Sequence, residues 1–391
     1  MVGRPESNQD NAGRMWSRRD VLRGGMLLGA GALAGPLLAA CSSSKPAASS
    51  GASSASSASS AATGAASASA KSGPAAKFSL GYQSTPDSGF FYLAEQNGWF
   101  NDAGIDPNLV YFTTGPALIQ GMTSGNPSVG HVGSVPVLQA AASGLFPIRI
   151  IDVMADVGAG YNIITKKGIT SVEQLRGQKI GLGVGTNDQY FLDAVLKKFG
   201  MTEKDVQMVN FNPVNRQQAF LAGQIPAVIP LIENSYVLLK QGVDAHVLFQ
   251  ASEFDKDPNP MQRPLVFDLI VTSANTIQPS HDAYQALVRT FNQKAIEYVT
   301  SPSTKDTAVK QLVDWSTNVI KNPTTTDAVT NKLATYTFYT PSSQLKQLVT
   351  SGTLQTELQN QAEFLVKIGQ SKAVPDFSKL IDTEFMLALS D

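Results

Sequence analysis

The sequence is poor in the residues that build metal centres and disulfides. It contains one cysteine, Cys41, and three histidines, His131, His246 and His281, among 391 residues. A single cysteine cannot form an internal disulfide. The histidines lie far apart, so no H-x-x-H, C-x-x-C or H-E-x-x-H spacing exists. We therefore expect no metal site and no bound cofactor.

An excess of charge of either sign is missing as well. The chain has 30 basic and 31 acidic residues, and its formal net charge is −1 at pH 7. Proteins that bind nucleic acid normally carry a basic patch or a high isoelectric point. We therefore expect no nucleic-acid partner.

Catalytic motifs are also missing. Gly181-x-Gly183-x-Gly185 follows an expected strand, but Thr186 stands where a dinucleotide-binding turn would need its last glycine. The chain has no G-x-x-x-x-G-K-[ST] phosphate loop and no G-x-S-x-G nucleophile elbow. The sequence therefore favours a protein that is not an enzyme.

The single cysteine ends an export signal. Residues 17–23 form a basic block with paired arginines, residues 26–38 are apolar, and small residues precede Cys41. The arginine pair resembles a twin-arginine signal, although the general export route stays open. The Leu-Ala-Ala-Cys ending resembles the lipobox of bacterial lipoproteins. We expect residues 1–40 to be a signal peptide and Cys41 to carry a lipid on the outer face of the bacterial cytoplasmic membrane.

The segment after the cysteine has the composition of a tether. Residues 41–76 are almost entirely Ser, Ala, Gly and Pro, with Lys45 and Lys71 as the charged side chains. A segment without aromatic or large apolar side chains cannot offset its ordering entropy. We expect a flexible tether that leads to a folded part of about 315 residues, long enough for two lobes with separate cores.

The remainder of the chain alternates between strand and helix patterns. Strand-like runs such as FSLGY, IDPNLVYF and IRIIDVM are separated by helix-like runs such as PALIQGMTSG and QYFLDAVLKKFG. The pattern restarts near Gly168, and the last 110 residues are mainly helical. The sequence predicts an α/β fold with largely parallel strands.

Five segments in a fixed order carry a family resemblance: LAEQNGWFNDAGID, TTGPALIQGMTSG, VGHVGSVPVLQAAASG, GITSVEQLRGQKIGLGVGT and AFLAGQIPAVI. In these segments the chain resembles the periplasmic substrate-binding proteins of ABC importers. Within them it is similar to the nitrate, sulfonate, taurine and thiamine-pyrimidine-precursor group. The resemblance implies a small-molecule solute and an ABC transporter permease as partners, with the membrane reached through the lipid anchor.

The resemblance also implies the two-lobe, type II periplasmic binding protein fold, with the ligand in a cleft between the lobes. Lobe one would then comprise residues 77–164 and 272–391, and lobe two residues 165–271. The two crossing segments would lie near Ile163–Thr165 and Val271–Ser273.

Ligands of open α/β sheets bind at the carboxyl ends of strands, where helix N-termini offer free N–H groups. Loops at such places supply the candidate site. Thr114, Ser134 and Thr186 could also be plain helix caps, and the tyrosines could be core residues. The candidate ligand-binding residues are Gln83, Ser84, Asp87, Thr114, Gly115, Gly133, Ser134, Tyr161, Gly185, Thr186, Asn187, Asp188, Glu233 and Asn234.

The charge of these loops bears on the ligand. They carry Asp87, Asp188 and Glu233 but no arginine, since Arg216 falls on an expected helix. Three carboxylates would repel an anion, which favours a neutral or amine-bearing ligand. The carboxylates could instead face solvent, so an anionic ligand stays open.

Two other functions remain open at this point. A sensor or scaffold lipoprotein could use the same cleft. An enzyme is also conceivable, because pyrimidine-precursor synthases share this fold. Those relatives depend on a cysteine-rich motif, and this chain has no cysteine other than Cys41.

Overall fold

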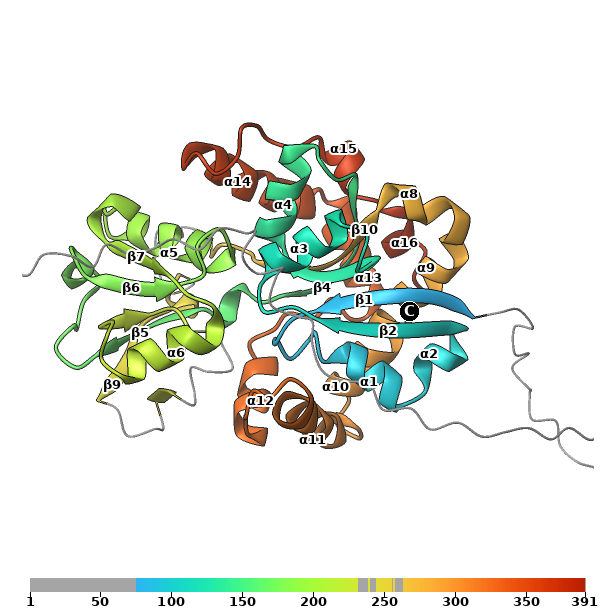
Figure 1. Cartoon of the computed structure of the whole chain (residues 1–391), viewed down its shortest axis with the longest axis horizontal. Coiled ribbons are helices and arrows are strands. Elements are labelled where there is room, and N and C mark those ends of the chain that lie inside the picture. The colour runs from blue at the N-terminus through green and yellow to red at the C-terminus, as the bar shows by residue number, and fades with distance from the viewer. Residues whose placement is uncertain (1–74, 231–237, 240–243, 255, 257–262, 391) are drawn as a thin grey trace, which may run out of the picture. The chain divides into compact units, whose positions relative to one another are not determined.

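The computed structural model describes residues 75–230, 238–239, 244–254, 256 and 263–390. The expected signal peptide, Cys41 and nearly all of the tether lie outside these residues. So do Glu233 and Asn234. The described chain forms two five-stranded sheets with helices packed on both (Figure 1).

The first sheet has the strand order β2-β1-β3-β10-β4. Strand β1 alternates between inward and outward side chains, so Phe78, Leu80 and Tyr82 enter the core. Residues 75–156 and 267–390 belong to this sheet and its helices, and we call them lobe one. Its first elements are β1 (Ala76–Tyr82), α1 (Phe90–Gln96), α2 (Trp99–Asp102), β2 (Ile105–Tyr111), α3 (Gly115–Thr123), β3 (Val129–Gly133), α4 (Ser134–Ser143), β4 (Ile148–Asp156) and β10 (Phe267–Ser273).

The second sheet has the order β7-β6-β8-β5-β9 and lies in residues 162–250, which we call lobe two. Helix α5 buries Phe191, Leu192 and Val195 against this sheet, as its 3.6-residue spacing requires. The elements are β5 (Asn162–Lys166), β6 (Lys179–Leu182), α5 (Asn187–Lys198), β7 (Gln207–Asn210), α6 (Pro213–Leu221), β8 (Ala227–Val228) and β9 (Ala245–Gln250).

The C-terminal part of lobe one is helical, as the sequence indicated. Two stretches, Thr290–Ala295 and Trp315–Val319, are π-helical. The α-helices are α8 (Ala274–Ile277), α9 (His281–Arg289), α10 (Ile296–Thr300), α11 (Lys305–Asp314), α12 (Thr326–Leu333), α13 (Ser342–Thr350), α14 (Thr353–Lys367), α15 (Phe377–Leu380) and α16 (Glu384–Leu387).

The strands are less parallel than the sequence predicted. Pairs β1–β2, β1–β3, β6–β7 and β6–β8 are parallel, whereas β10 runs antiparallel to β3 and β4, and β5 runs antiparallel to β8 and β9. Strands β5 and β10 are the first strands after the chain passes from one sheet to the other. They enter their sheets from the opposite end, so each sheet is mixed.

The crossing segments also differ from the prediction. Ile163–Thr165 lies inside β5 and Val271–Ser273 inside β10. Residues 157–161 instead link the first sheet to the second, and residues 263–266 lead back into β10. Both segments are fastened to Asp156, which accepts hydrogen bonds from Gly158 N (2.9 Å) and Val266 N (3.0 Å) and pairs with Arg263 (2.7 Å). The lobe boundaries therefore fall several residues earlier than the sequence suggested.

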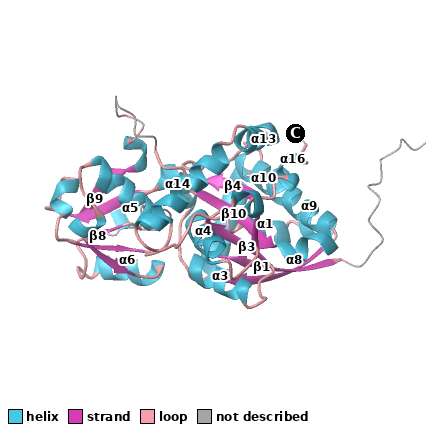
Figure 2. Cartoon of the chain, turned by 90° about the horizontal axis from the view of Figure 1, so that it is seen from above, coloured by secondary structure: helices cyan, strands magenta, loops and turns pink. Residues whose placement is uncertain are grey.

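A second connection between the lobes comes from α14. Figure 2 shows α14 beside α5 of lobe two. The rings of Tyr190 and Phe364 are 5.3 Å apart, and Lys197 Nζ lies 5.7 Å from the same Phe364 ring. The described part of the chain contains no helix that is both long enough and apolar enough to cross a membrane.

Candidate functional site

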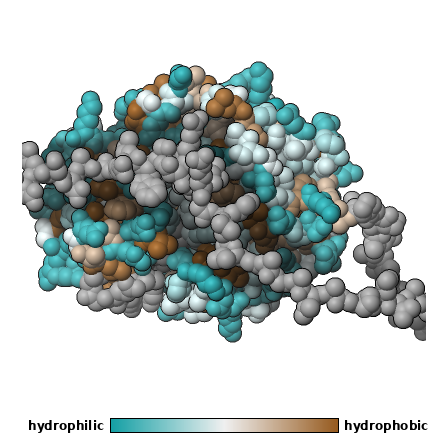
Figure 3. All heavy atoms as spheres, in the orientation of Figure 1, coloured by the Kyte–Doolittle hydropathy of each residue, from teal (hydrophilic) through white to brown (hydrophobic). Residues whose placement is uncertain are grey.

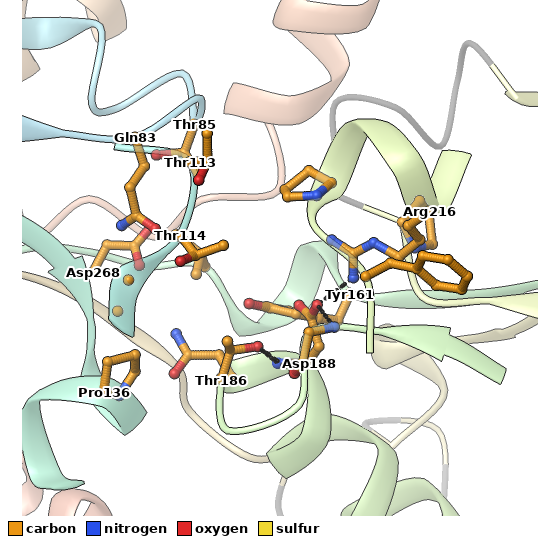
Figure 4. Close-up of a pocket in the computed structure, with 18 of the residues that line it drawn as sticks. Gln83, Thr85, Thr113, Thr114, Pro136, Tyr161, Thr186, Asp188, Arg216 and Asp268 are labelled. Atoms are coloured by element: carbon orange, nitrogen blue, oxygen red, sulfur yellow. Dashed lines mark hydrogen bonds and ion pairs between the residues drawn. The ribbon is translucent and has the colours of Figure 1, made fainter. Parts of the chain in front are cut away.

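A pocket lies between the two sheets and is lined from both lobes. In the space-filling view, apolar side chains gather in the hollow between the lobes, whereas much of the visible outer surface is hydrophilic (Figure 3). The close-up shows Gln83, Thr114 and Asp268 of lobe one on one side and Arg216 and Asp188 of lobe two on the other (Figure 4). Polar side chains that belong to different lobes therefore face the same pocket.

Most of the candidate ligand residues lie in this lining. All but Tyr161, which precedes β5, lie at the end of a strand or the start of a helix. The lining includes Gln83, Thr114, Gly115, Gly133, Tyr161, Thr186, Asn187 and Asp188.

Four other candidates lie elsewhere. Ser84 lines a smaller, separate pocket beside Trp315. Asp87 and Ser134 are completely buried behind the main lining, and Gly185 lies next to it, near Gln139 and Gln370. None of these four residues belongs to the lining of the main pocket.

Helix N-termini face the pocket from both lobes. Thr114 caps α3 by accepting a hydrogen bond from Ala117 N (3.3 Å), and Thr186 caps α5 by accepting one from Asp188 N (3.2 Å). Helices α4 and α6 also begin in the lining, at Gly133 and Pro213. Capping and pocket lining are therefore compatible roles for the threonines. The helix dipoles give the site a positive potential that favours anions.

The lobe-two wall contains a buried ion pair. Arg216 extends from α6 to Asp188 at the start of α5, and both side chains are less than one-tenth exposed. Asp188 also accepts a hydrogen bond from Gly183 N (2.9 Å). Arg216 Nε is buried and has no hydrogen-bond partner among the described residues. The pair is thus neutral overall, and Arg216 keeps a buried donor without a partner among the described residues.

The ion pair corrects the sequence argument about ligand charge. That argument placed Arg216 outside the cleft because it lies on a helix, but the side chain reaches the lining. Asp188 is neutralised by Arg216, and Asp87 does not line the pocket. The expected repulsion of an anion by these two carboxylates is therefore absent.

The lobe-one wall contains a different buried cluster. Asp268 lines the pocket from β10, and one of its carboxyl oxygens lies within 4.8 Å of a carboxyl oxygen of Asp87. Asp87 lies 3.0 Å from His131 Nε2 and 3.4 Å from Tyr336 Oη. His131 Nδ1 lies 2.6 Å from Ser88 Oγ. We call Asp87, His131 and Asp268 the lobe-one triad.

Burial and mutual contact set the charges of the triad. Burial alone raises the pKa of Asp87, but the neighbouring His131 outweighs it and lowers that pKa. Burial lowers the pKa of His131, yet the charge of Asp87 raises it overall. Burial, together with the charge of Asp87, raises the pKa of Asp268 well above its usual value. Asp87 and His131 therefore form an ion pair, and Asp268 is the carboxyl of the triad that keeps a proton most readily.

The triad has the composition of a metal site, since its potential ligand atoms lie within 4.8 Å of one another. Its hydrogen bonds, however, already use the atoms that a cation would need. Lys332 also lines the pocket and is near enough to act on Asp268 electrostatically. We therefore treat the triad as a hydrogen-bonded group and assign no metal to it.

Sequence reasoning missed several lining residues. Phe211 follows β7 and Pro213 begins α6, just as Thr113 lies between β2 and α3. The same strand-end argument could therefore have found them. Asp268 begins a strand instead of following one. Lys332 and Tyr336 come from the helical C-terminal region, where no local pattern marks them. They reach the pocket only because α12 packs against lobe one.

Comparisons with known proteins agree with this architecture. A protein of Brucella abortus (strain 2308) described as a binding protein is 33% identical over 135 residues, 34% of this chain. The match spans 41% of that relative's length. The taurine-binding periplasmic protein of Escherichia coli (strain K12) is 23% identical over 313 residues, which cover 80% of this chain and 93% of that protein.

Solved structures show the same fold. The alkanesulfonate-binding protein SsuA from Xanthomonas axonopodis pv. citri, bound to MOPS, superposes with a TM-score of 0.63 at 19% identity. The superposition covers 80% of this chain and all of that chain. The two-lobe periplasmic binding protein fold predicted from the sequence is thereby confirmed. The NMT1/THI5-like family model matches residues 85–304, more than half of the chain. The chain therefore belongs to the NMT1/THI5-like family.

Proposed function

We propose that the protein is the solute-binding component of an ABC importer and that it holds a small organic solute by an anionic group such as a sulfonate. The lobe-two wall is the observation that carries this proposal. There, the N-termini of α5 and α6 meet Arg216, whose Nε is buried without a partner among the described residues. A guanidinium donor beside helix N-termini is well suited to a sulfonate or carboxylate.

The names of relatives support the same ligand class. One relative binds taurine, and the Xanthomonas structure holds MOPS, which is also a sulfonate. The polar groups of this pocket allow a comparable ligand, since the one carboxylate of the lobe-two wall is already paired with Arg216. The proposed role is binding and delivery without chemistry.

The direct test is to identify the ligand that the protein retains. The protein is purified under native conditions without added sulfonate, denatured, and the released small molecules are analysed by mass spectrometry. We expect an organic anion in about equal amount to the protein, and Arg216→Met should abolish its retention. An uncharged pyrimidine in its place would contradict the anionic ligand while leaving a binding role intact.

The importer partnership has a separate test. Deleting the protein from the cell that makes it should abolish high-affinity uptake of the identified solute. Unchanged uptake, together with a lost transcriptional response to the solute, would favour a sensor instead.

We further propose that the protein is anchored by a lipid on Cys41, outside the cytoplasmic membrane. The support is the lipobox-like sequence and the tether that follows it. Cys41→Ala should release the protein from membranes without changing its unfolding curve, because the tether separates the anchor from the folded lobes. Ser44→Ala is the matched control and should stay membrane-bound. A Cys41→Ala protein that remains in the membrane fraction would refute the anchor.

A further inference from the structure

The lobe-one triad presents a carboxyl group to the pocket that the proposed function does not use. Asp268 lines the pocket on the side opposite Arg216 (Figure 4). The two walls therefore offer a guanidinium at one end of the pocket and a carboxyl group at the other.

Two buried carboxyl groups share one imidazole in this cluster. Ligand atoms of Asp87, His131 and Asp268 lie within 4.8 Å of one another, and two ionised carboxylates so close together in a buried place repel each other, which favours a proton on one of them. Asp87 already lies within hydrogen-bonding reach of His131 Nε2 and Tyr336 Oη, which suits the ionised form. The proton therefore belongs to Asp268. The remaining oxygen of Asp268 is an acceptor.

We propose that an ammonium group on the bound solute takes the place of this proton: Asp268 gives the proton to solvent and pairs with the ammonium as a carboxylate. The inference rests on the proposed function, since it concerns the same pocket. The reaction conserves charge and atoms. A carboxylic acid and an ammonium become a carboxylate–ammonium pair and one released proton.

The groups around Asp268 agree with this exchange. Burial and Asp87 raise the pKa of Asp268, whereas His131 and Lys332 lower it, and burial prevails in the empty pocket. A ligand ammonium adds a further positive charge at contact distance, which favours ionisation. The charged or titratable groups that face Asp268 are Asp87 before α1, His131 on β3, Tyr161 before β5, Lys332 on α12, and the Asp188–Arg216 pair across the pocket.

The exchange would make the site selective for solutes that carry both charges. A simple alkyl anion would fill the Arg216 end and leave the acid undisturbed. An amino-substituted anion would reach both walls and release a proton on binding. Its affinity should then rise with pH up to the pKa of Asp268, because less work is needed to remove the proton.

The test uses taurine and ethanesulfonate, which differ by one amino group. Calorimetry in two buffers of different ionisation enthalpy counts the protons released by the full-length protein. We expect about one proton with taurine near neutral pH and none with ethanesulfonate. Where Asp268 is protonated in the ligand-free protein and taurine carries its ammonium, taurine affinity should increase by up to about tenfold per pH unit. Ethanesulfonate affinity should stay level or fall.

Two variants complete the experiment. Asp268→Asn mimics the protonated acid, so it should lose the preference for taurine over ethanesulfonate and lose the proton release. Asp152→Asn removes another buried carboxyl that does not line the pocket. This change should leave the preference for taurine and the proton release unchanged. A protonated-carboxyl infrared band should also be present in the empty wild-type protein at neutral pH and be reduced in Asp268→Asn.

The outcomes separate the two proposals. Taurine and ethanesulfonate binding equally well, without proton release, would overturn the exchange while the anion-binding role stands. An infrared spectrum in which Asp268→Asn changes nothing would also overturn it. Failure of both sulfonates to bind a folded protein would contradict the proposed function and the exchange together.

Discussion

The two walls of the pocket bury charged groups with different sets of partners. Lobe two pairs one carboxylate, Asp188, with one guanidinium, Arg216, so both groups stay ionised. Lobe one buries two carboxyls beside one imidazole, and the carboxyl left over keeps a proton. The shifted pKa values of Asp87, His131 and Asp268 make lobe one the place where ligand charge and pH should interact.

Removing half of the lobe-two pair should have the largest effect. Arg216→Met leaves Asp188 buried without its counter-charge, and we expect a loss of about 3–5 kcal/mol in the free energy of unfolding. Urea denaturation measures this loss. The double variant Arg216→Met with Asp188→Leu should regain most of the stability but not ligand binding.

The control for this prediction is an exposed pair. Arg176 contacts Asp205 on the surface of lobe two, and Arg176→Met should change the unfolding midpoint only slightly. Equal losses in the two variants would mean that burial does not distinguish the pairs, and the comparison between the walls would fail.

The second-largest effect should be the pH dependence of stability that arises in lobe one. Burial raises the pKa of Asp152, on β4 beneath the triad, to about 8 from its usual value of 3.8. Between these two pH values the folded protein holds one more proton than the unfolded chain. Stability should therefore fall as pH rises through this window, by up to about 1.4 kcal/mol per pH unit.

Urea unfolding at pH 6 and pH 8 tests this response. Asp152→Asn should flatten the decline, whereas Asp244→Asn, at an exposed pair with Lys167, should not. An unchanged slope in Asp152→Asn would show that this carboxyl does not bind the extra proton.

A smaller effect should come from changing a contact between the two walls of the pocket. A methyl group on Gly133 would clash with the side-chain amide of Asn187, which belongs to lobe two. Asn187 also accepts a hydrogen bond from Val135 N (3.0 Å) at the start of α4. Gly133 has φ −64 and ψ 153, an ordinary extended conformation, so alanine fits the backbone.

Gly133→Ala should therefore oppose closure of the lobes rather than folding. We expect ligand affinity to weaken by about 1–3 kcal/mol, with a larger radius of gyration in solution scattering and an unchanged unfolding midpoint. The control is Val137→Ala, in the same helix but away from the pocket. This change should lower the unfolding midpoint and leave ligand affinity unchanged. A normal affinity in Gly133→Ala would show that the two walls need not approach this closely.

The smallest effect should come from a glutamine bridge beside the pocket. Gln370 accepts a hydrogen bond from Gln139 of lobe one (2.8 Å) and donates one to Gln189 of lobe two (2.9 Å). Gln370→Ala should weaken ligand binding by about 0.5–1.5 kcal/mol, because the bond from Gln370 to Gln189 forms only when the lobes are together. Titration calorimetry with the identified ligand measures it. Gln359→Ala, whose amide bonds to Glu363 within α14, is the matched control and should bind normally.

The local sequence determined the elements and much of the site. Alternating strand and helix patterns set the α/β class, and the strand-end argument placed Gln83, Thr114, Thr186 and Asp188 in loops that the structure brings to one pocket. This succeeded because the carboxyl end of a strand and the N-terminus of the next helix are neighbours in the chain. Their position therefore follows from sequence alone.

Tertiary structure decided which charges meet. Arg216 joins Asp188 across 28 residues, and His131 joins Asp87 across 44, so no spacing rule could pair them. The same is true of Asp268, whose strand returns from the other lobe and runs against its neighbours. Burial, which raises the pKa of Asp268 and leaves Arg216 Nε without a partner among the described residues, is a property of the packed lobes. The sequence thus determined where polar groups gather, and only packing decided their charge, because desolvation depends on neighbours that are distant along the chain.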